Sequence, residues 1–409
     1  MTAYERLLKY VEYPTASDAT NPKCPSSPEQ KLLGAALVEE MKALGIEDAV
    51  MDDNGYVTGT IPSNIKDRDD IPTIGFIAHM DVVRDVPWTF IKPCYIEEYN
   101  GGDILLNEEQ DIWLRPADFD SLKEVVGHDL IVTDGTTLLG ADDKAGIAEI
   151  MTMAERLLKI DPFPHGTVKI GFTPDEEIGR GADLFPVEAF GADYAYTVDG
   201  GAFGEIDFET FNAASARVTV NGRSTHPGGA KNRMRNASLL AMEFHCLLPH
   251  AERPEHTELR EGFYHLTAIK GECEQATLSY ILRDHDLALL EQRKEMMQKA
   301  AAFMNAKYGE DTIVLELIDS YRNMAEKILP HPEILELARK AIAKLGGTPV
   351  STAVRGGTDG SRLSFMGLPC PNLGTGGRGA HGRFEYVSVD EMEKCTQTLT
   401  EIVRLATEK

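Results

Sequence analysis

The stretch TIGFIAHMD, residues 73–81, decides the fold class, because an apolar run of strand length ends directly at a histidine and an aspartate. Three other apolar runs end in the same way. They are VKIGF (168–172) before Asp175-Glu176-Glu177, YAYTV (194–198) before Asp199, and a short run over 370–373 before a glycine-rich loop that reaches His381. Ligands of open α/β sheets bind beyond the carboxyl ends of the strands. The four runs therefore predict one site, built of His, Asp and Glu, at one edge of a sheet.

The order of the predicted elements divides the chain into two domains. Strands and helices alternate up to about residue 208 and again after residue 322, whereas the chain between them has alternating strands with two helical runs, 236–248 and 287–308. We predict an α/β fold with a discontinuous catalytic domain, residues 1–208 and 323–409, whose mixed, mostly parallel sheet is flanked by helices. Residues 209–322 are predicted to form an inserted α+β lid domain, an antiparallel sheet with two helices.

Composition excludes several classes of partner. The chain has 409 residues, with 41 Lys and Arg against 66 Asp and Glu, and this net charge of −25 repels phosphate backbones and anionic lipids. We therefore expect no nucleic-acid partner and no membrane partner. The six cysteines show no CxxC pairing, the N-terminus has no apolar signal region, and no stretch has the roughly 20 apolar residues that span a bilayer. These features predict a cytoplasmic protein with free thiols.

The residues at the predicted sheet edge are more informative together than singly. On its own, each has an ordinary structural interpretation, such as the helix N-cap for Asp142 or an acidic first turn for Glu176 and Glu177. Imidazole and carboxylate together are the ligands that hold zinc with a position left open, and two ions fit if one carboxylate bridges them. Because Glu176 and Glu177 are adjacent and point in different directions, one can bind metal while the other acts as general base. The full set is His79, Asp81, Asp142, Glu176, Glu177, Asp199 and His381.

Six strings give a resemblance that extends from the first helix to the last. GFIAHMD, TLLGADDKAGIAEIM, GFTPDEEIGRGAD, AYTVDGG, RDHD and VRGGTDGSRLSFMGLPCPNLGTGG resemble the tripeptide-cleaving aminopeptidases of a large family of dinuclear zinc exopeptidases and deacylases. The resemblance implies two Zn²⁺ per subunit, with Co²⁺ or Mn²⁺ as alternative ions. It implies that an activated water releases the N-terminal residue of a tripeptide. A sister dipeptidase, carboxypeptidase or N-acyl amino acid deacylase activity is the alternative, and a silent peptide-binding protein is a rival that the complete ligand set opposes.

The same resemblance implies which residues hold the two ions. His79 and Asp199 belong to the first zinc, Glu177 and His381 to the second, and Asp142 bridges them. The peptide bond between Asp142 and the next residue is expected to be cis.

Two further residues are implied to be catalytic without holding metal. Asp81 fixes the imidazole of His79, which is a common arrangement for metal-binding histidines, and Glu176 is the general base.

Three residues are predicted to contact a short peptide substrate. The resemblance implies that His226 stabilises the oxyanion and that Arg283 binds the peptide's C-terminal carboxylate through paired hydrogen bonds. Arg355, before a glycine-rich run, is a further candidate. A homodimer formed through the lid domain is an additional hypothesis.

Overall fold

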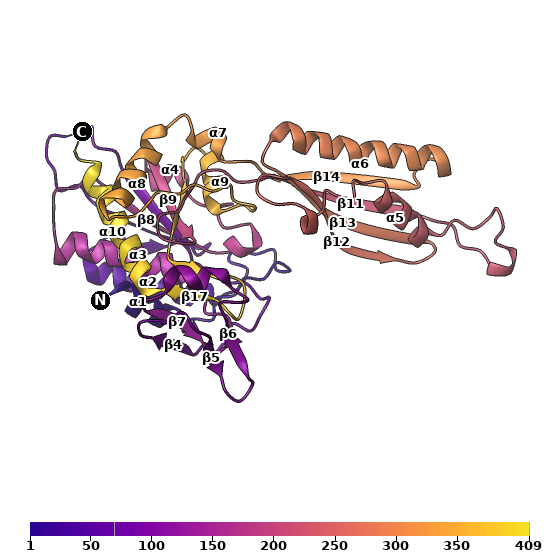
Figure 1. Cartoon of the computed structure of the whole chain (residues 1–409). Helices are drawn as coiled ribbons and strands as arrows, with labels where there is room; N and C mark the ends of the chain where they lie inside the picture. The colour runs from indigo at the N-terminus through magenta and orange to yellow at the C-terminus, as the bar shows by residue number, and fades with distance from the viewer. Residues whose placement is uncertain (69, 409) are drawn as a thin grey trace. The chain divides into compact units, whose positions relative to one another are not determined.

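The computed structural model describes residues 1–68 and 70–408, which form two compact units (Figure 1). Unit 2 comprises Glu209–Asn323 and Ala353–Gly357, and unit 1 comprises the remaining described chain. The predicted boundaries at 208/209 and 322/323 lie within one residue of this division. The short segment Ala353–Gly357, which we predicted in the first domain, groups instead with unit 2. The reason is local: the Val354 N–H donates to the Glu209 carbonyl at 2.9 Å, and the Gly356 carbonyl accepts from the Phe211 N–H at 3.2 Å.

A seven-stranded sheet forms the centre of unit 1. Its order is β1 (Val50–Met51), β2 (Val57–Ile61), β8 (Val168–Thr173), β3 (Ile74–His79), β9 (Tyr194–Gly200), β15 (Asn372–Gly374) and β10 (Ile206–Asp207). The four central strands β8, β3, β9 and β15 are parallel, and β2 and β10 pair antiparallel at either side of them. These four strands are the four apolar runs of the sequence, so the predicted mixed sheet is confirmed.

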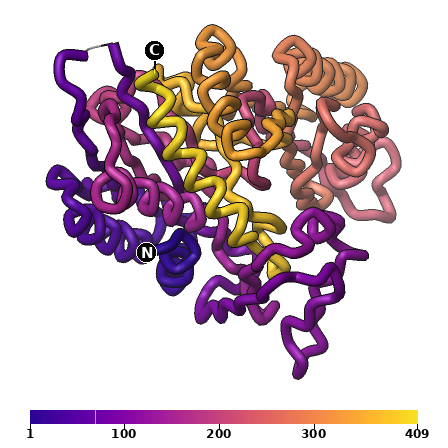
Figure 2. Tube along the Cα trace, turned by 60° about the vertical axis from the view of Figure 1, so that its left-hand side comes forward, coloured from indigo at the N-terminus to yellow at the C-terminus, as the bar shows by residue number. Residues whose placement is uncertain are grey.

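Helices bury both faces of this sheet. Phe76 in β3 belongs to a large core built with α1, α2, α3, α8 and α10, whereas its neighbour Ile77 points to the opposite face and joins a smaller cluster with Phe190 of α4 and Leu363 of α9. Helix α10, yellow in Figure 2, packs against α1, α3 and α8. The helix bounds are α1 Ala3–Tyr10, α2 Gln30–Leu44, α3 Ala141–Glu155, α4 Val187–Phe190, α7 Ala325–Ile328, α8 Pro332–Lys344, α9 Asp359–Phe365 and α10 Val389–Leu405.

Unit 1 also contains a second, smaller sheet that the sequence pattern did not indicate. Its order is β16 (Gly377–Arg378), β17 (Tyr386–Ser388), β7 (Leu130–Thr133) and β4 (Pro93–Ile96), and a separate hairpin pairs β5 (Ile104–Asn107) with β6 (Ile112–Leu114). Strands of two to four residues carry too short a pattern to be distinguished from loops.

Unit 2 has the predicted antiparallel sheet with two helices. The strand order is β12 (Phe263–Gly271), β13 (Gln275–Asp284), β11 (Asn212–Asn221) and β14 (Ile313–Tyr321). Helices α5 (Ala237–Cys246) and α6 (Leu287–Tyr308) pack on this sheet and share its apolar core. Alternate residues of β11 and β13 are buried, as expected for strands with one covered face.

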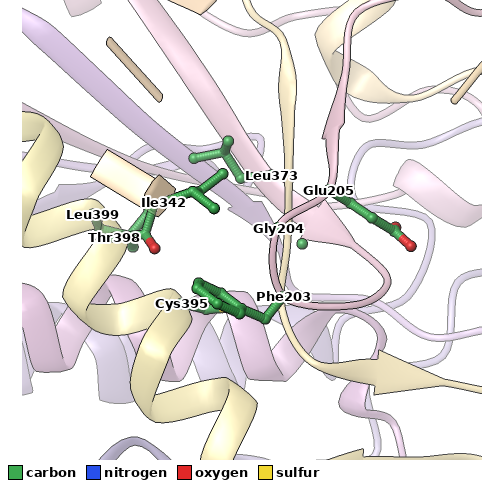
Figure 3. A pocket seen from close by; sticks show the side chains of 9 residues that line it. Phe203, Gly204, Glu205, Ile342, Leu373, Cys395, Thr398 and Leu399 are labelled. Atoms are coloured by element: carbon green, nitrogen blue, oxygen red, sulfur yellow. The ribbon is translucent and has the colours of Figure 1, made fainter. Parts of the chain in front are cut away.

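Local signals explain several helix ends. Thr2 and Glu5 form a capping box at the start of α1, and Gly45 ends α2 in the left-handed conformation with φ of 109°. A small cavity beside β15, lined from α8, α10 and the turn before β10, has room for about one water molecule (Figure 3). Its lining contains none of the predicted site residues. Within the described chain, no helix combines the length and the apolar character needed to cross a bilayer.

Candidate metal centre

The structure brings the five predicted ligands together at the carboxyl edge of the central strands. His79 is the last residue of β3, Asp199 lies one residue before the end of β9, and Glu177 lies in the short turn after β8. Asp142 is the second residue of α3. His381 lies between β16 and β17, so the loop predicted to carry it is held by the small second sheet.

The imidazole nitrogens and carboxylate oxygens have the separations of ligands on a shared pair of ions. The Nε2 atom of His79 lies 3.0 Å from Oδ1 of Asp142 and 3.5 Å from Oδ1 of Asp199. The Nε2 atom of His381 lies 3.2 Å from Oδ2 of Asp142 and 2.9 Å from Oε2 of Glu177. Ligands bound at about 2.0–2.1 Å to a tetrahedral ion are about 3.3 Å apart. Asp142 therefore turns one oxygen towards each imidazole, as a bridging carboxylate does.

One carboxylate oxygen of the site is left without a hydrogen bond by the residues that the structure describes. The buried Oε1 atom of Glu177 has no hydrogen-bond partner among the described residues. Ligand atoms of His79, Asp142 and Glu177 lie within 4.8 Å of one another, and so do those of His79, Asp143 and Asp199. A buried carboxylate oxygen without a hydrogen bond is costly unless a cation compensates it. The residues present thus fit a pair of divalent cations.

Asp81 contacts two elements of the site, the end of β3 and the turn after β8. The Nδ1 atom of His79 lies 3.0 Å from the Asp81 carbonyl oxygen and 3.5 Å from its carboxylate. A bond to a carbonyl requires the proton on Nδ1, which leaves the Nε2 lone pair free to bind an ion. The fully buried Asp81 carboxylate also accepts the backbone N–H groups of Glu176 at 2.9 Å and Glu177 at 3.2 Å. Asp81 therefore connects the end of β3 to the turn after β8.

The protonation of the ligand groups reflects an excess of acidic side chains. Hydrogen bonds to Asp142 and Glu177 raise the pKa of His381 to about 11. Burial would lower the pKa of His79, but Asp199 and Asp142 outweigh it and raise that pKa well above its usual value. Burial raises the pKa of Glu177 to about 7 and that of Asp199 to about 6. The site therefore holds more negative charge than its two imidazoles balance, which favours divalent cations.

Glu176 is placed beside the ligands without being one of them. It is the first residue of the single turn Glu176–Ile178. Burial raises its pKa well above the usual value for a glutamic acid, and the negative charge of Asp199 adds to the shift. A carboxylate with a raised pKa next to a cation site is suited to accept a proton from water.

The start of α3 differs from the N-cap alternative for Asp142. The N-cap residue is Gly140, in the left-handed conformation with φ of 75°, and no side chain caps the helix there. The carboxylate of Asp142 faces the two imidazoles instead. The bond between Asp142 and Asp143 is cis, as expected.

Two acidic residues that we did not predict accept hydrogen bonds from backbone N–H groups at or beside the predicted ligands. Asp143, almost fully buried, accepts the backbone N–H of His79 at 3.1 Å. Glu385, 3% exposed, accepts the N–H groups of Leu139, Gly140 and Asp142 at 2.8, 2.7 and 2.9 Å. No sequence motif pointed to Glu385, which lies more than two hundred residues from its partners.

Two other buried charged groups flank the site. Lys144 donates to the Tyr13 carbonyl at 2.7 Å, and burial lowers its pKa to about 7. Asp359 accepts the hydroxyl of Thr173 at 2.7 Å, and burial raises its pKa to about 7. Asp142 was a candidate N-cap for this helix start, but nothing in the sequence indicated the burial of Lys144.

The three predicted substrate contacts all lie in unit 2. His226 is exposed, and its Nδ1 accepts the Gly228 N–H at 3.2 Å. Arg283 lies in β13 with its guanidinium over the ring of Tyr321. Arg355 donates to the carbonyls of Leu259 and Glu261, both at 2.9 Å, and to the hydroxyl of Thr257 at 3.0 Å. Three of the five donors of Arg355 are therefore used within unit 2.

Comparison with known proteins places this geometry in a family. Residues 117–405 match peptidase family M20/M25/M40. Peptidase T of Alkaliphilus oremlandii is 53% identical over 401 residues, 98% of each chain, and peptidase T of Bacillus subtilis is 50% identical over 400 residues, 98% of this chain and 97% of that one. The crystal structure of aminopeptidase PepT from Bacillus cereus shares the fold with a TM-score of 0.77 at 24% identity, over 99% of this chain and 98% of that one.

An open α/β sheet with imidazoles and carboxylates gathered at its carboxyl edge defines a metal-dependent hydrolase. The chain belongs to peptidase family M20/M25/M40, and it is a metallopeptidase.

Proposed function

We propose that this enzyme is an aminopeptidase that releases the N-terminal residue of tripeptides, and that two Zn²⁺ ions serve its reaction. The observation that carries the proposal is the pair of Asp142 oxygens, one facing each imidazole. The name of these relatives, peptidase T, supports a peptide substrate.

We assign the first ion to His79 and Asp199, the second to Glu177 and His381, and both to Asp142. When bound, such a pair polarises the scissile carbonyl and acidifies a water. Co²⁺ and Mn²⁺ are alternatives, because the same ligand types accept them.

The chain's own residues then move the proton. Glu176 takes the proton of the attacking water on its carboxylate and later passes it to the nitrogen of the leaving amine. Its raised pKa suits both steps, because the group must accept the proton and then release it. Asp81 keeps the turn that carries Glu176 at a fixed distance from His79 through its two backbone hydrogen bonds.

The residues predicted to contact the substrate belong to unit 2. We propose His226 for the oxyanion and Arg283 for the C-terminal carboxylate of the peptide. Arg283 donates to the carbonyls of Leu282 and Ala214 through one nitrogen, Nη1, so other guanidinium donors remain for a substrate. Arg355 is the less favoured contact, because most of its donors are used by Leu259, Glu261 and its other neighbours.

A matched series of substrates tests the proposal. A dipeptide, a tripeptide, a tetrapeptide and an N-acetylated tripeptide are each incubated with the enzyme, with added Zn²⁺ and with chelator. We expect chelator-sensitive release of the N-terminal residue from the unblocked tripeptide. Preference for the N-acetylated substrate would assign the enzyme to the deacylases, and preference for the dipeptide would assign it to the dipeptidases.

We also propose a cytoplasmic location and a homodimer formed through the lid domain. The six cysteines, all free in the structure, support a reducing compartment. Light scattering of the purified enzyme tests the dimer, for which a single-chain mass is the contrary result.

A further inference from the structure

The N-terminal loop reaches the turn that carries Glu176. This loop, residues 14–29, is rich in Pro and Ser, leads directly into Gln30 at the start of α2, and takes no part in the function described so far. The side chains of Ser26 in the loop and of Gln30 directly after it bind Asp175, which precedes Glu176. Ser26, Gln30 and Asp175 are almost completely buried, with exposed fractions of 2%, 0% and 1%, respectively.

The contacts form a closed set of hydrogen bonds. The Asp175 carboxylate accepts the Ser26 N–H at 2.8 Å, the Ser26 hydroxyl, and the Gln30 side-chain amide at 2.7 Å. In return, the Gln30 side-chain oxygen accepts the Asp175 N–H at 3.0 Å. Buried hydrogen bonds to a carboxylate are among the stronger polar contacts in proteins. The contacts therefore fix Asp175 through both its side chain and its backbone.

Asp175 needs this support, because its backbone is in the left-handed region with φ of 59°. A non-glycine residue adopts that conformation rarely and keeps it only where its surroundings enforce it. Every backbone N–H from Asp175 to Glu177 is bound by a buried side-chain oxygen, the first by Gln30 and the next two by Asp81.

The loop also holds the strand end on the other side of the site. The Thr15 hydroxyl donates to the Met80 carbonyl at 2.6 Å, and the Ser17 N–H donates to the Val82 carbonyl at 3.1 Å. These two carbonyls flank Asp81. One loop thus fixes both the end of β3 and the turn after β8.

We propose that Ser26 and Gln30 are positioning residues, which act through Asp175 to hold Glu176 at the distance from the ligands that proton transfer requires. This inference rests on the proposed role of Glu176 as general base. Catalytic groups must be held close to their productive geometry, and a displacement of about 1 Å costs about a hundredfold in rate.

The test compares Ser26→Ala and Gln30→Met with a matched control, Ser17→Ala. The control makes the same chemical change in the same loop and keeps the backbone N–H by which Ser17 binds Val82. It alters a side chain that is 3% exposed and whose hydroxyl has no hydrogen-bond partner among the described residues. We expect kcat for a tripeptide to fall about 10- to 100-fold in the two test variants, with KM changed less than about threefold and two ions still bound. The control is expected to keep normal kcat.

Two readouts distinguish positioning from a general structural role. In a Glu176→Gln background, Ser26→Ala is expected to cause no further loss of kcat, because the group it positions is already absent. Hydrogen exchange of metal-free protein is expected to rise in the peptide over 174–180 for Ser26→Ala and not for Ser17→Ala. The inference would be overturned if Ser26→Ala lowered kcat equally in the wild-type and the Glu176→Gln backgrounds. It would also be overturned if Ser26→Ala left both kcat and the hydrogen exchange over 174–180 unchanged. Absence of tripeptide hydrolysis by the wild-type enzyme would overturn the proposed function instead, while the exchange result would still decide whether the loop holds the turn.

Discussion

Replacement of Glu149 by methionine is expected to stabilise the enzyme. Glu149 lies inside α3 with none of its side chain exposed, and neither carboxylate oxygen has a hydrogen-bond partner among the described residues. Burial, followed by the negative charge of Glu393 on α10, raises the pKa of Glu149 well above its usual value. Methionine has a similar length and a similar helix propensity, and it requires no partner.

The magnitude follows from the missing hydrogen bonds. A buried polar group without a partner costs about 1–3 kcal/mol, so Glu149→Met should raise the free energy of unfolding by about that amount in weakly acidic buffer. In the unfolded chain Glu149 loses its proton near pH 4.3, whereas the folded chain keeps it to higher pH. Between these two pKa values the unfolded state binds fewer protons, so the wild-type protein loses stability as pH rises. The gap between variant and wild type should therefore widen with pH, by at most about 1.4 kcal/mol per pH unit.

Calorimetry of both proteins from weakly acidic to weakly alkaline buffer measures this gap. Glu39→Met, the same change at an exposed position of α2, is the control and should shift the free energy of unfolding by less than about 0.5 kcal/mol. A Glu149→Met protein that is less stable than wild type, or a gap that stays constant with pH, would refute the reasoning that Glu149 is a neutral acid without a partner.

The remaining predictions concern the site itself. Glu176→Gln should lower kcat about 10²- to 10⁴-fold while equilibrium dialysis still finds two bound ions, whereas Glu177→Gln should lose one ion. Gly146→Ala should cost at least about 3 kcal/mol of stability or prevent soluble expression, because a Cβ atom there would lie 1.8 Å from the Val198 carbonyl oxygen. Glu385→Gln should weaken metal binding about 10- to 100-fold by calorimetric titration, because its carboxylate holds the loop that begins α3 through three N–H groups.

Each of these results has a contrary outcome. A near-normal kcat in Glu176→Gln would show that Glu176 is not the general base. Two bound ions in Glu177→Gln would show that Glu177 is not a metal ligand. Gly229→Ala, at a position where a Cβ atom would meet nothing within 4 Å, is the control for Gly146→Ala, and equal stability of the two would contradict the packing argument. Unchanged metal affinity in Glu385→Gln would show that the loop at α3 needs no such support.

The sequence allowed the architecture and the ligand cluster to be predicted because both depend on local patterns. Apolar runs that lead to His79, Glu177 and Asp199 are visible without any knowledge of their neighbours, and parallel strands bring their carboxyl ends to one edge. The resemblance to a known family supplied the proposed bridging role of Asp142, which spacing alone left open between ligand and N-cap.

The supporting residues could not be predicted, because their contacts join distant parts of the chain. Gln30 meets Asp175 across 145 residues, and Glu385 meets the N–H of Leu139 across 246. Neither residue lies in a pattern that distinguishes a buried acceptor from an exposed one. The segment Ala353–Gly357 groups with unit 2 for a related reason: its backbone hydrogen bonds join it to Glu209 and Phe211, which lie far earlier in the sequence.

The interruption of unit 1 by unit 2 has a consequence for the timing of synthesis. A ribosome releases His79, Asp142, Glu177 and Asp199 first, then the main segment of unit 2, Glu209–Asn323, and only later the segment that contains His381 and helix α10. Domains generally fold as they emerge from the ribosome. Unit 1, however, lacks a central strand, β15, until the segment that follows the main part of unit 2 has emerged. The second imidazole and the helix that covers α3 arrive together. We therefore expect a chain whose synthesis stops before His381 to lack both the second imidazole and α10, and so to be inactive towards peptides.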